Sequence, residues 1–557
     1  MGSALFLILA CAEPPAPWEG PVLTQPREAL TVAQLQDTQT LELLDMSFFA
    51  RPDWAEDSSR EFSGTLRFED SELLAPKDRE SYEGEDSFPA LTLELVSDGG
   101  LLHAQPMGVI DTRAESASYW DVYVGTGAIW EEPDDGGWSR ASLPVNLLGR
   151  YVGEVRNCVA TWVFDDTQTS NVYLQCSQET AVLDAGQLGD LRAMLPVGFT
   201  PLEADPALLA EAQARYAARI PVEPLAELDA EGEIAAHFDR DHVTNASTSL
   251  GGVYWDGTLY LHPAATRHGP FPYPQDMRHG VFSVTKSMAG ALAMFTLAER
   301  YGDEVFDAQI VDYVPALADL PEWQGVSFSH CLNMVTGTRA GEDLLYEPLE
   351  LAPDSETAIQ NIAAFGDYPE APGEAFNYAT TNTFVLSYAM ERYVQEREGP
   401  DAHYWDIVHD SVLVPIGAQD FAVLHTRDEA PQDRVPILGL GGLPSADSAL
   451  KIALLIANEG EHNGQQLLSR TRVREALGRE DFEGYKAWSG LRYRHSFWVQ
   501  SVRVGGCKVE LTYMEGLGDN RVVLFPSGAV SLQFTDEFDD DFKELVRAVE
   551  GLHSSCD

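Results

Sequence analysis

The sequence predicts an α+β protein: a β-rich N-terminal domain, then an antiparallel sheet flanked by helices and completed by a helical lobe. Three observations favour this architecture. Residues 27–200 read mostly as strands, residues 283–480 are rich in helical patterns, and strand patterns return at 507–534. With 557 residues the chain is also too long for one ordinary domain, so we expect two.

The first 26 residues read as an export signal followed by a proline-rich tether. The apolar run at 4–10 suits a signal-peptide core but is too short to span a bilayer as a helix. The run Ile8-Leu9-Ala10-Cys11 resembles a bacterial lipoprotein box, in which the cysteine is lipidated. We therefore expect a protein of the bacterial cell envelope anchored at Cys11. The alternative is a plain secretory signal and a soluble secreted or periplasmic protein.

Residues 27–200 are predicted to form the β-rich domain, and no catalytic pattern indicates its role. Apolar and polar residues alternate, as in half-buried strands, at 64–68, 91–96 and 120–124. Residues 201–229 form the predicted connection, with a helix over 206–220 that ends at Pro221.

The cysteines agree with export. Cys158 and Cys176 lie on two strand patterns joined by a short turn, so we expect them to form a disulfide in an oxidising compartment. Cys507 and Cys556 are candidates for a second bond. Cys331 stands among apolar helix residues and is expected to be a buried thiol.

The second domain is predicted to span residues 230–557. It opens with a hairpin at 253–261, whose Asp-Gly pair favours a tight turn. Late strands at 507–513, 521–525 and 529–534 precede a last helix at 540–552. Early strands that pair with late strands around a helical middle place a site between the sheet and the helical lobe.

A serine and a lysine stand three residues apart where an apolar helix begins. One helical turn separates Ser283 from Lys286, so the hydroxyl and the amine share a face. Burial lowers the pKa of a lysine, which lets it take the proton of a serine nucleophile. The alternative for Ser283 is an N-cap residue beside a lysine that reaches solvent. Ser448 and Lys451 repeat the spacing, but there we expect an ordinary amphipathic helix with a solvent-facing lysine.

Two further segments contain residues that could take part in acyl transfer. Tyr378 follows a Pro-Gly turn before an apolar helix; beside an ammonium group its phenol is expected to have a lowered pKa and to relay protons. Glycines at 516 and 518 adjoin a strand and let a substrate approach the backbone, as an oxyanion site requires. Taken alone, Tyr378 reads as a packing aromatic and the glycines as a hairpin turn.

Together these segments resemble the serine β-lactamase and penicillin-binding-protein superfamily, in its class C β-lactamase-related branch, from about residue 230 to the C-terminus. Phe282-Ser283-Val284-Thr285-Lys286 resembles the first motif, Tyr378 the tyrosine of the second, and Met514-Glu515-Gly516 the third without its cation. Thr380 holds the position at which the family usually has asparagine, and Asn382 follows two residues later.

The resemblance implies a β-lactamase-like fold and a division of roles. Ser283 is the expected nucleophile, and Lys286 and Tyr378 the expected proton carriers. The backbone N–H groups of Ser283 and Leu517 are expected to bind the oxyanion. The remaining candidates for substrate binding are Gly516, Asn382 and Met514.

Composition limits the partners. There are 36 basic and 89 acidic residues, so the formal net charge is −53, and such a chain repels nucleic acid and anionic membrane surfaces. Adaptation of the surface to salt explains the same charge. We expect no metal and no cofactor, since no metal-ligand spacing occurs.

The combined reading is an exported serine hydrolase that acts through an acyl-enzyme on a small ester or amide. Because Glu515 repels a carboxylate, a neutral ester or amide is favoured over a β-lactam. The alternative is a non-catalytic envelope protein that keeps the fold and binds a ligand.

Overall fold

The computed structural model describes residues 27–75, 83–105, 107–150, 153–179, 189–238, 248–339, 342, 352–488, 490–536, 542–552 and 554–556. The expected export signal, the proline-rich tether and Cys11 lie outside these residues.

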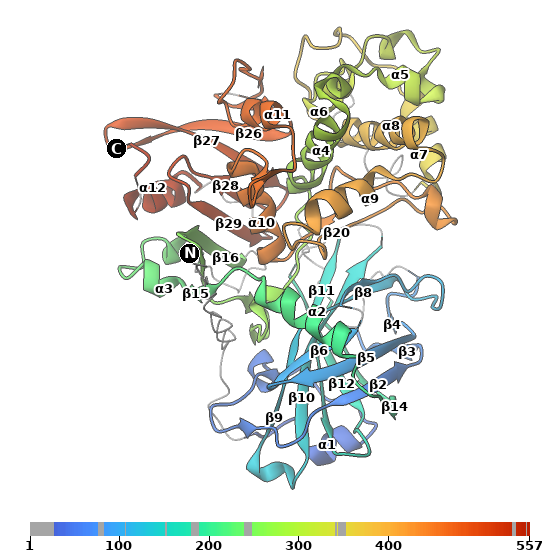
Figure 1. Cartoon of the computed structure of the whole chain (residues 1–557), viewed down its shortest axis with the longest axis vertical. Coiled ribbons are helices and arrows are strands. Elements are labelled where there is room, and N and C mark those ends of the chain that lie inside the picture. Colours follow the sequence, from blue (N-terminus) through green and yellow to red (C-terminus); the bar gives the residue numbers. More distant parts are fainter. Residues whose placement is uncertain are drawn as a thin grey trace, which may run out of the picture.

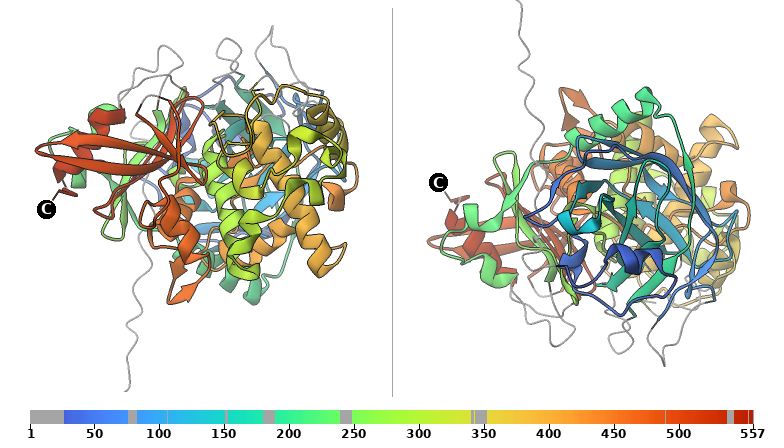
Figure 2. Two further views of the ribbon diagram at one scale, coloured as in Figure 1. Left: turned by 90° about the horizontal axis from the view of Figure 1, so that it is seen from above. Right: turned by 90° about the horizontal axis from the view of Figure 1, so that it is seen from below.

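A large antiparallel sheet fills the N-terminal part of the chain. Within the described residues it has twelve strands, in the main order β13-β12-β11-β10-β9-β6-β5-β2-β14. The strands that carry most of its core are β2 (Ser63–Phe68), β5 (Leu91–Asp98), β8 (Trp120–Val124), β10 (Ser139–Gly149), β11 (Val155–Phe164) and β12 (Val172–Gln178). The sheet curls on itself, as the view from below shows (Figure 2). The predicted β-rich region and its three alternating strands are confirmed.

A second antiparallel sheet, of nine strands within the described residues, joins the two ends of the C-terminal part. Its order is β15-β17-β16-β29-β28-β27-β26-β25-β24. The strands that matter here are β16 (Thr248–Trp255), β17 (Thr258–Leu261), β26 (Phe497–Val504), β27 (Cys507–Gly516), β28 (Asn520–Leu524) and β29 (Val530–Thr535). β16 pairs with β29, so early and late strands meet as predicted.

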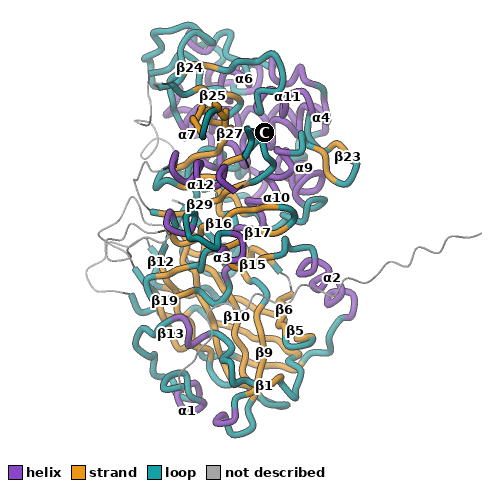
Figure 3. The backbone as a smooth tube through the Cα atoms, turned by 90° about the vertical axis from the view of Figure 1, so that its left-hand side faces the viewer, coloured by secondary structure: helices purple, strands orange, loops and turns teal. Residues whose placement is uncertain are grey.

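Helices cover both faces of this sheet. α12 (Phe542–Leu552) packs its apolar residues against β26 and β27 on one face. α10 (Ala446–Ala457) packs against β28 and β29 and continues the core into α4 (Leu292–Tyr301) and α8 (Thr380–Glu398). The helices of this lobe lie beside the sheet and above the N-terminal strands (Figures 1 and 3). The predicted α+β fold, an antiparallel sheet flanked by helices with a helical lobe after a β-rich N-terminal part, is confirmed.

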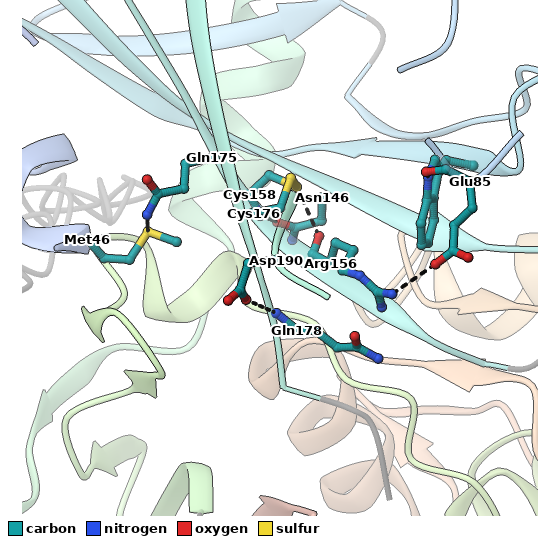
Figure 4. The surroundings of a disulfide bond; sticks show 10 residues. Met46, Glu85, Asn146, Arg156, Cys158, Gln175, Cys176, Gln178 and Asp190 are labelled. Carbon is teal, nitrogen blue, oxygen red and sulfur yellow. Dashed lines mark hydrogen bonds and ion pairs between the residues drawn. A yellow bond between two sulfur atoms is a disulfide. The ribbon is translucent and has the colours of Figure 1, made fainter. Parts of the chain in front are cut away.

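Two disulfides are present. Cys158 and Cys176 are directly paired neighbours on β11 and β12, and their bond closes the two strands as predicted (Figure 4). Cys507 at the start of β27 is bonded to Cys556 after α12. Cys331 is free and fully buried. Since disulfides persist in oxidising compartments, the two bonds indicate an extracellular or periplasmic protein. No helix in the described parts of the chain is long and apolar enough to cross a membrane.

The N-terminal sheet holds the segment that leads to Ser283. The buried Asn157 side chain donates to the carbonyl of Arg278 at 2.9 Å and accepts from its N–H at 2.8 Å. Asn146 donates to the carbonyl of Asp276 at 2.7 Å. The apolar side chain of Val159 on β11 lies in the same core as Val281 and Val284, which flank the serine. Strand residues from the first sheet therefore fix the chain a few residues ahead of Ser283.

Candidate functional site

Ser283 lies in a tight turn that leads directly into a helix. Phe282, the preceding residue, has φ of +44°, a left-handed conformation that costs roughly 1–3 kcal/mol and recurs at functional sites. The N–H of Lys286 donates to the carbonyl of Ser283 at 3.1 Å, and Lys286–Ala291 continues as a π-helical turn. Such turns inside helices are rare and often mark functional sites.

The amine of Lys286 has three short contacts. Its Nζ lies 2.8 Å from Ser283 Oγ, 2.8 Å from Thr380 Oγ1 and 2.7 Å from the carbonyl oxygen of Gly439. The side chain is fully buried. Burial lowers the pKa of Lys286 to about 8, although the carboxylate of Glu342 opposes the shift. A useful fraction of this amine is therefore neutral near pH 7 and able to accept a proton.

The phenol of Tyr378 shares the serine. It is hydrogen bonded to the Ser283 side chain, and Lys286 Nζ lies 4.8 Å from the centre of its ring. Desolvation and the nearby carboxylates of Glu342 and Glu515 raise the pKa of Tyr378 well above its usual value. The expectation of a lowered pKa was wrong, because burial, helped by the neighbouring Tyr493 and the two carboxylates, outweighs the hydrogen bond with Ser283. The phenol stays protonated at neutral pH, so it is suited to give a proton, whereas Lys286 is suited to take one.

Gly516 allows strand β27 to approach the serine. A Cβ atom at this position would collide with the carbonyl oxygen of Val281 and would lie 2.9 Å from the backbone nitrogen of Ser283. Leu517 follows at the strand end with 37% of its surface exposed. The close approach brings the end of β27 and the start of the serine helix to one place, as an oxyanion site built from both backbones requires.

Two of the predicted binding residues lie elsewhere. Asn382 is buried in α8, where its side-chain oxygen accepts a hydrogen bond from Thr336 at 3.1 Å. Met514 is fully buried in the core that also contains Val284 and Met288, because its side chain leaves the sheet on the face opposite to Glu515.

The structure adds Thr380, Glu342 and Gly439 to the predicted site; the sequence had marked only Thr380, as the residue at the family's asparagine position. The Thr380 hydroxyl accepts a hydrogen bond from Lys286 Nζ and donates one to Glu342 at 3.1 Å. A polar contact with the lysine is therefore present where the family pattern has asparagine. The signal for Thr380 was its position two residues after Tyr378. Gly439 contributes only a backbone carbonyl, which leaves no side-chain signal in a sequence.

The second serine–lysine spacing is structural. Ser448 is fully buried in the N-terminal turn of α10, where it exchanges hydrogen bonds with Ser445. Lys451 does not face solvent as expected: its Nζ lies 2.6 Å from Asp447 and 2.9 Å from the carbonyl of Gly417. The amine is thus held by a carboxylate and a backbone carbonyl.

Aromatic rings line the site beside Tyr378. Tyr378 stacks on Trp498 with ring centres 5.7 Å apart, and Trp498 stacks on Trp488 at 5.0 Å. Trp488 is 58% exposed. We call these three rings the aromatic wall.

The charges around the site are mostly negative. Glu515 is ion-paired with Arg521 at 2.9 Å, and the same guanidinium binds Asp519 at 3.1 Å. Arg521 is thus shared by two carboxylates and does not supply a free positive charge for a substrate. The exposed carboxylate of Glu342 adds to this negative field.

Comparison with known proteins finds a family match for part of the chain. Residues 248–492 match the family model described as beta-lactamase. No curated protein matches the sequence.

Solved structures with a similar course of the chain have low sequence identity to it. A family VIII carboxylesterase is 15% identical with a TM-score of 0.44, over 60% of this chain and 98% of that one. A penicillin-binding protein homologue from Caulobacter crescentus is 15% identical with a TM-score of 0.43, over 60% and 98%. A D-amino acid amidase from Ochrobactrum anthropi SV3 is 15% identical with a TM-score of 0.40, over 58% and 99%. Similarities at this level of identity and TM-score say nothing about the reaction that this chain catalyses.

Proposed function

We propose that this chain, whose residues 248–492 form a domain of the β-lactamase family, is an exported serine hydrolase that cleaves an ester or amide through an acyl-enzyme. The observation that carries the proposal is the 2.8 Å contact between Lys286 Nζ and Ser283 Oγ, with the amine buried and its pKa lowered to about 8. A neutral amine at that distance is a base for the serine hydroxyl.

Each step assigns a proton to a named atom. Lys286 Nζ takes the proton of Ser283 Oγ as the oxygen attacks the carbonyl carbon. The N–H groups of Ser283 and Leu517 bind the oxyanion that forms. The leaving alcohol or amine departs with the proton of the Tyr378 phenol, which recovers one from Lys286. A water molecule then attacks the acyl carbon and gives one proton to the same pair of groups. These groups return the proton to Ser283 Oγ as the bond between this oxygen and the acyl carbon breaks and the acid leaves.

The preferred substrate lacks a carboxylate near the reacting bond. A carboxylate about 4 Å from Glu515 would be repelled by about 1 kcal/mol in water-like surroundings and by more where water is excluded. Arg521, which is held by Glu515 and Asp519, does not offset this repulsion. Neutral esters and amides are therefore favoured over penicillins and cephalosporins.

Labelling with a fluorophosphonate tests the nucleophile. We expect the probe to modify Ser283, as read by peptide mass spectrometry, and Ser283→Ala to abolish both labelling and ester hydrolysis. Ser448→Ala is the matched control, because Ser448 also precedes a lysine by three residues but lies buried. Labelling that is lost equally in both variants, or absent from the wild type, contradicts the assignment. Absence of labelling from the wild type favours a non-catalytic envelope protein that binds a ligand.

A panel of esters, amides and β-lactams tests the substrate class. We expect kcat/KM for a neutral short-chain ester to exceed that for a penicillin. A penicillin or cephalosporin that is hydrolysed better overturns this part of the proposal.

We also propose that the protein is anchored in the bacterial cell envelope through lipid on Cys11. The lipoprotein-like run before this cysteine supports the anchor. In a bacterial host, the wild type is expected in the membrane fraction and Cys11→Ser in the soluble fraction. A wild type that is soluble after export favours the plain secretory signal.

A further inference from the structure

The aromatic wall runs from the serine to solvent. Its inner member, Tyr378, is hydrogen bonded to Ser283, and the ring of Trp498 lies on it with an angle of 20° between the planes. The outer member, Trp488, stacks on Trp498 at 23° and is 58% exposed. Trp488 also lies near Tyr378, with ring centres 6.1 Å apart, and near Phe376 at 6.0 Å, and it still keeps 58% of its surface exposed. A group attached to the reacting carbonyl thus meets an open indole surface.

The charges beside this wall are unbalanced. Glu342 and Glu515 both lower the stability of negative charge on Tyr378, so their fields reach the inner end of the wall. Glu342 is exposed, and 28% of the Glu515 side-chain surface is exposed to solvent. Two carboxylates share Arg521, and Lys286 is buried behind the serine. Among the described groups at this place, negative charge therefore exceeds positive charge.

We propose that Trp488 determines specificity by binding an ammonium group of the substrate against its exposed face, with the carboxylates of Glu342 and Glu515 as counter-charges. The inference rests on the proposed function and adds to it a substrate class: an ester or amide that carries a primary or quaternary ammonium group a few bonds from the scissile carbonyl.

The charge of an ammonium group makes it bind more tightly at this site than a neutral alkyl group of the same shape. An indole face attracts a cation through the quadrupole of the ring, and nearby carboxylates strengthen that attraction. A neutral alkyl group gains only the apolar contact, and an anion is repelled by Glu515. Trp488, with its large exposed ring, would otherwise stand as an apolar surface facing water.

A matched pair of substrates tests the proposal. Two p-nitrophenyl esters carry the same three-carbon spacer and end in either a trimethylammonium or a tert-butyl group, which have nearly the same shape. Their kcat/KM values are divided by their rates of alkaline hydrolysis to remove differences in intrinsic reactivity. We expect the charged ester to be preferred by roughly three- to tenfold. The preference should fall as salt is added, because exposed charges are screened.

Variants locate the preference. Trp488→Leu and Glu515→Gln are each expected to bring the ratio toward one. Glu510→Gln is the control, because Glu510 is ion-paired with an arginine at 2.9 Å, as Glu515 is, but lies five residues earlier on the same strand; it should leave the ratio unchanged.

The possible failures are distinguishable. A ratio of one or less, in an enzyme that hydrolyses the tert-butyl ester, overturns the ammonium site and leaves the proposed function standing. A ratio that survives Trp488→Leu also overturns it. If neither ester is hydrolysed and Ser283 is not acylated by the fluorophosphonate, the proposed function fails and the ammonium site fails with it.

Discussion

Lys286 owes its chemistry to what surrounds it. All three of its contacts are with neutral oxygen atoms, and the one carboxylate that affects its charge, Glu342, reaches it through Thr380. Lys451, by contrast, contacts the carboxylate of Asp447 directly. The same spacing in the sequence therefore gives a base at one place and a structural ion pair at the other.

The pH dependence of acylation follows from this amine. Since burial lowers the pKa of Lys286 to about 8, the protonated and inactive form dominates below that value. We expect kcat/KM for a neutral ester to rise about tenfold per pH unit below pH 8 and to level off above it. Stopped assays across this range measure the profile. A flat profile between about pH 6 and 9 would contradict the role of Lys286 as base.

Removing one oxygen atom tests Tyr378. Tyr378→Phe keeps the ring that stacks on Trp498 but loses the hydroxyl bonded to Ser283. We expect kcat to fall by roughly a hundredfold or more, the range for a general acid, with the melting temperature nearly unchanged. Lys508→Ala, an exposed change on β27, is the control for both readouts. Equal losses in the two variants would show that the phenol has no special role.

At the scale of elements, the site depends on how closely a strand and a helix start approach each other. Gly516 ends β27 against the backbone of residues 281–284, so a larger residue must push the strand away. We expect Gly516→Ala to reduce kcat/KM by at least a hundredfold and to destabilise the fold by about 1–3 kcal/mol. Gly506→Ala, where a Cβ meets open space at the other end of β27, should change neither. Enzyme assays and urea unfolding measure both effects; an active Gly516→Ala enzyme contradicts the close approach.

Elements with local signals could be predicted from the sequence. The Asp-Gly turn indicated the hairpin of β16 and β17, and alternating residues indicated β2, β5 and β8. Side-chain partners across elements could not be predicted. Asn382 and Met514 stand near the motifs in the sequence, but both side chains are buried away from the serine. A shift of one residue along a helix or a strand changes the face on which a side chain lies, and the motifs do not specify that face.

At the scale of the whole molecule, the site also depends on the N-terminal sheet. No pattern in residues 27–200 indicated this, because the contacts are made by amide side chains to backbone atoms. Asn157 satisfies both the N–H and the carbonyl of Arg278 in a fully buried position. Such pairing leaves no signal beyond a polar residue in a strand.

Asn157→Ala tests this dependence. Loss of the side chain leaves two buried backbone groups unpaired, which costs about 1–3 kcal/mol each when no water replaces the partner. We expect a lower midpoint in urea unfolding and a lower kcat, because the chain ahead of Ser283 is held less firmly. Asn171→Ala, a change at an exposed asparagine contact of the same sheet, is the control. An Asn157→Ala protein with wild-type stability and activity would show that the contact is dispensable.

The hydrogen bonds from Asn146 and Asn157 to residues 276–278 have a consequence for how the two parts of this protein evolve. If recombination joined the C-terminal part to a different N-terminal domain, the backbone groups of residues 276 and 278 would be buried without their hydrogen-bond partners. The two halves must therefore be transmitted together, and amide positions in the first sheet should change over evolutionary time only in step with the segment that they hold. Three hydrogen bonds, all of them outside the catalytic groups, thus link the two halves of the chain.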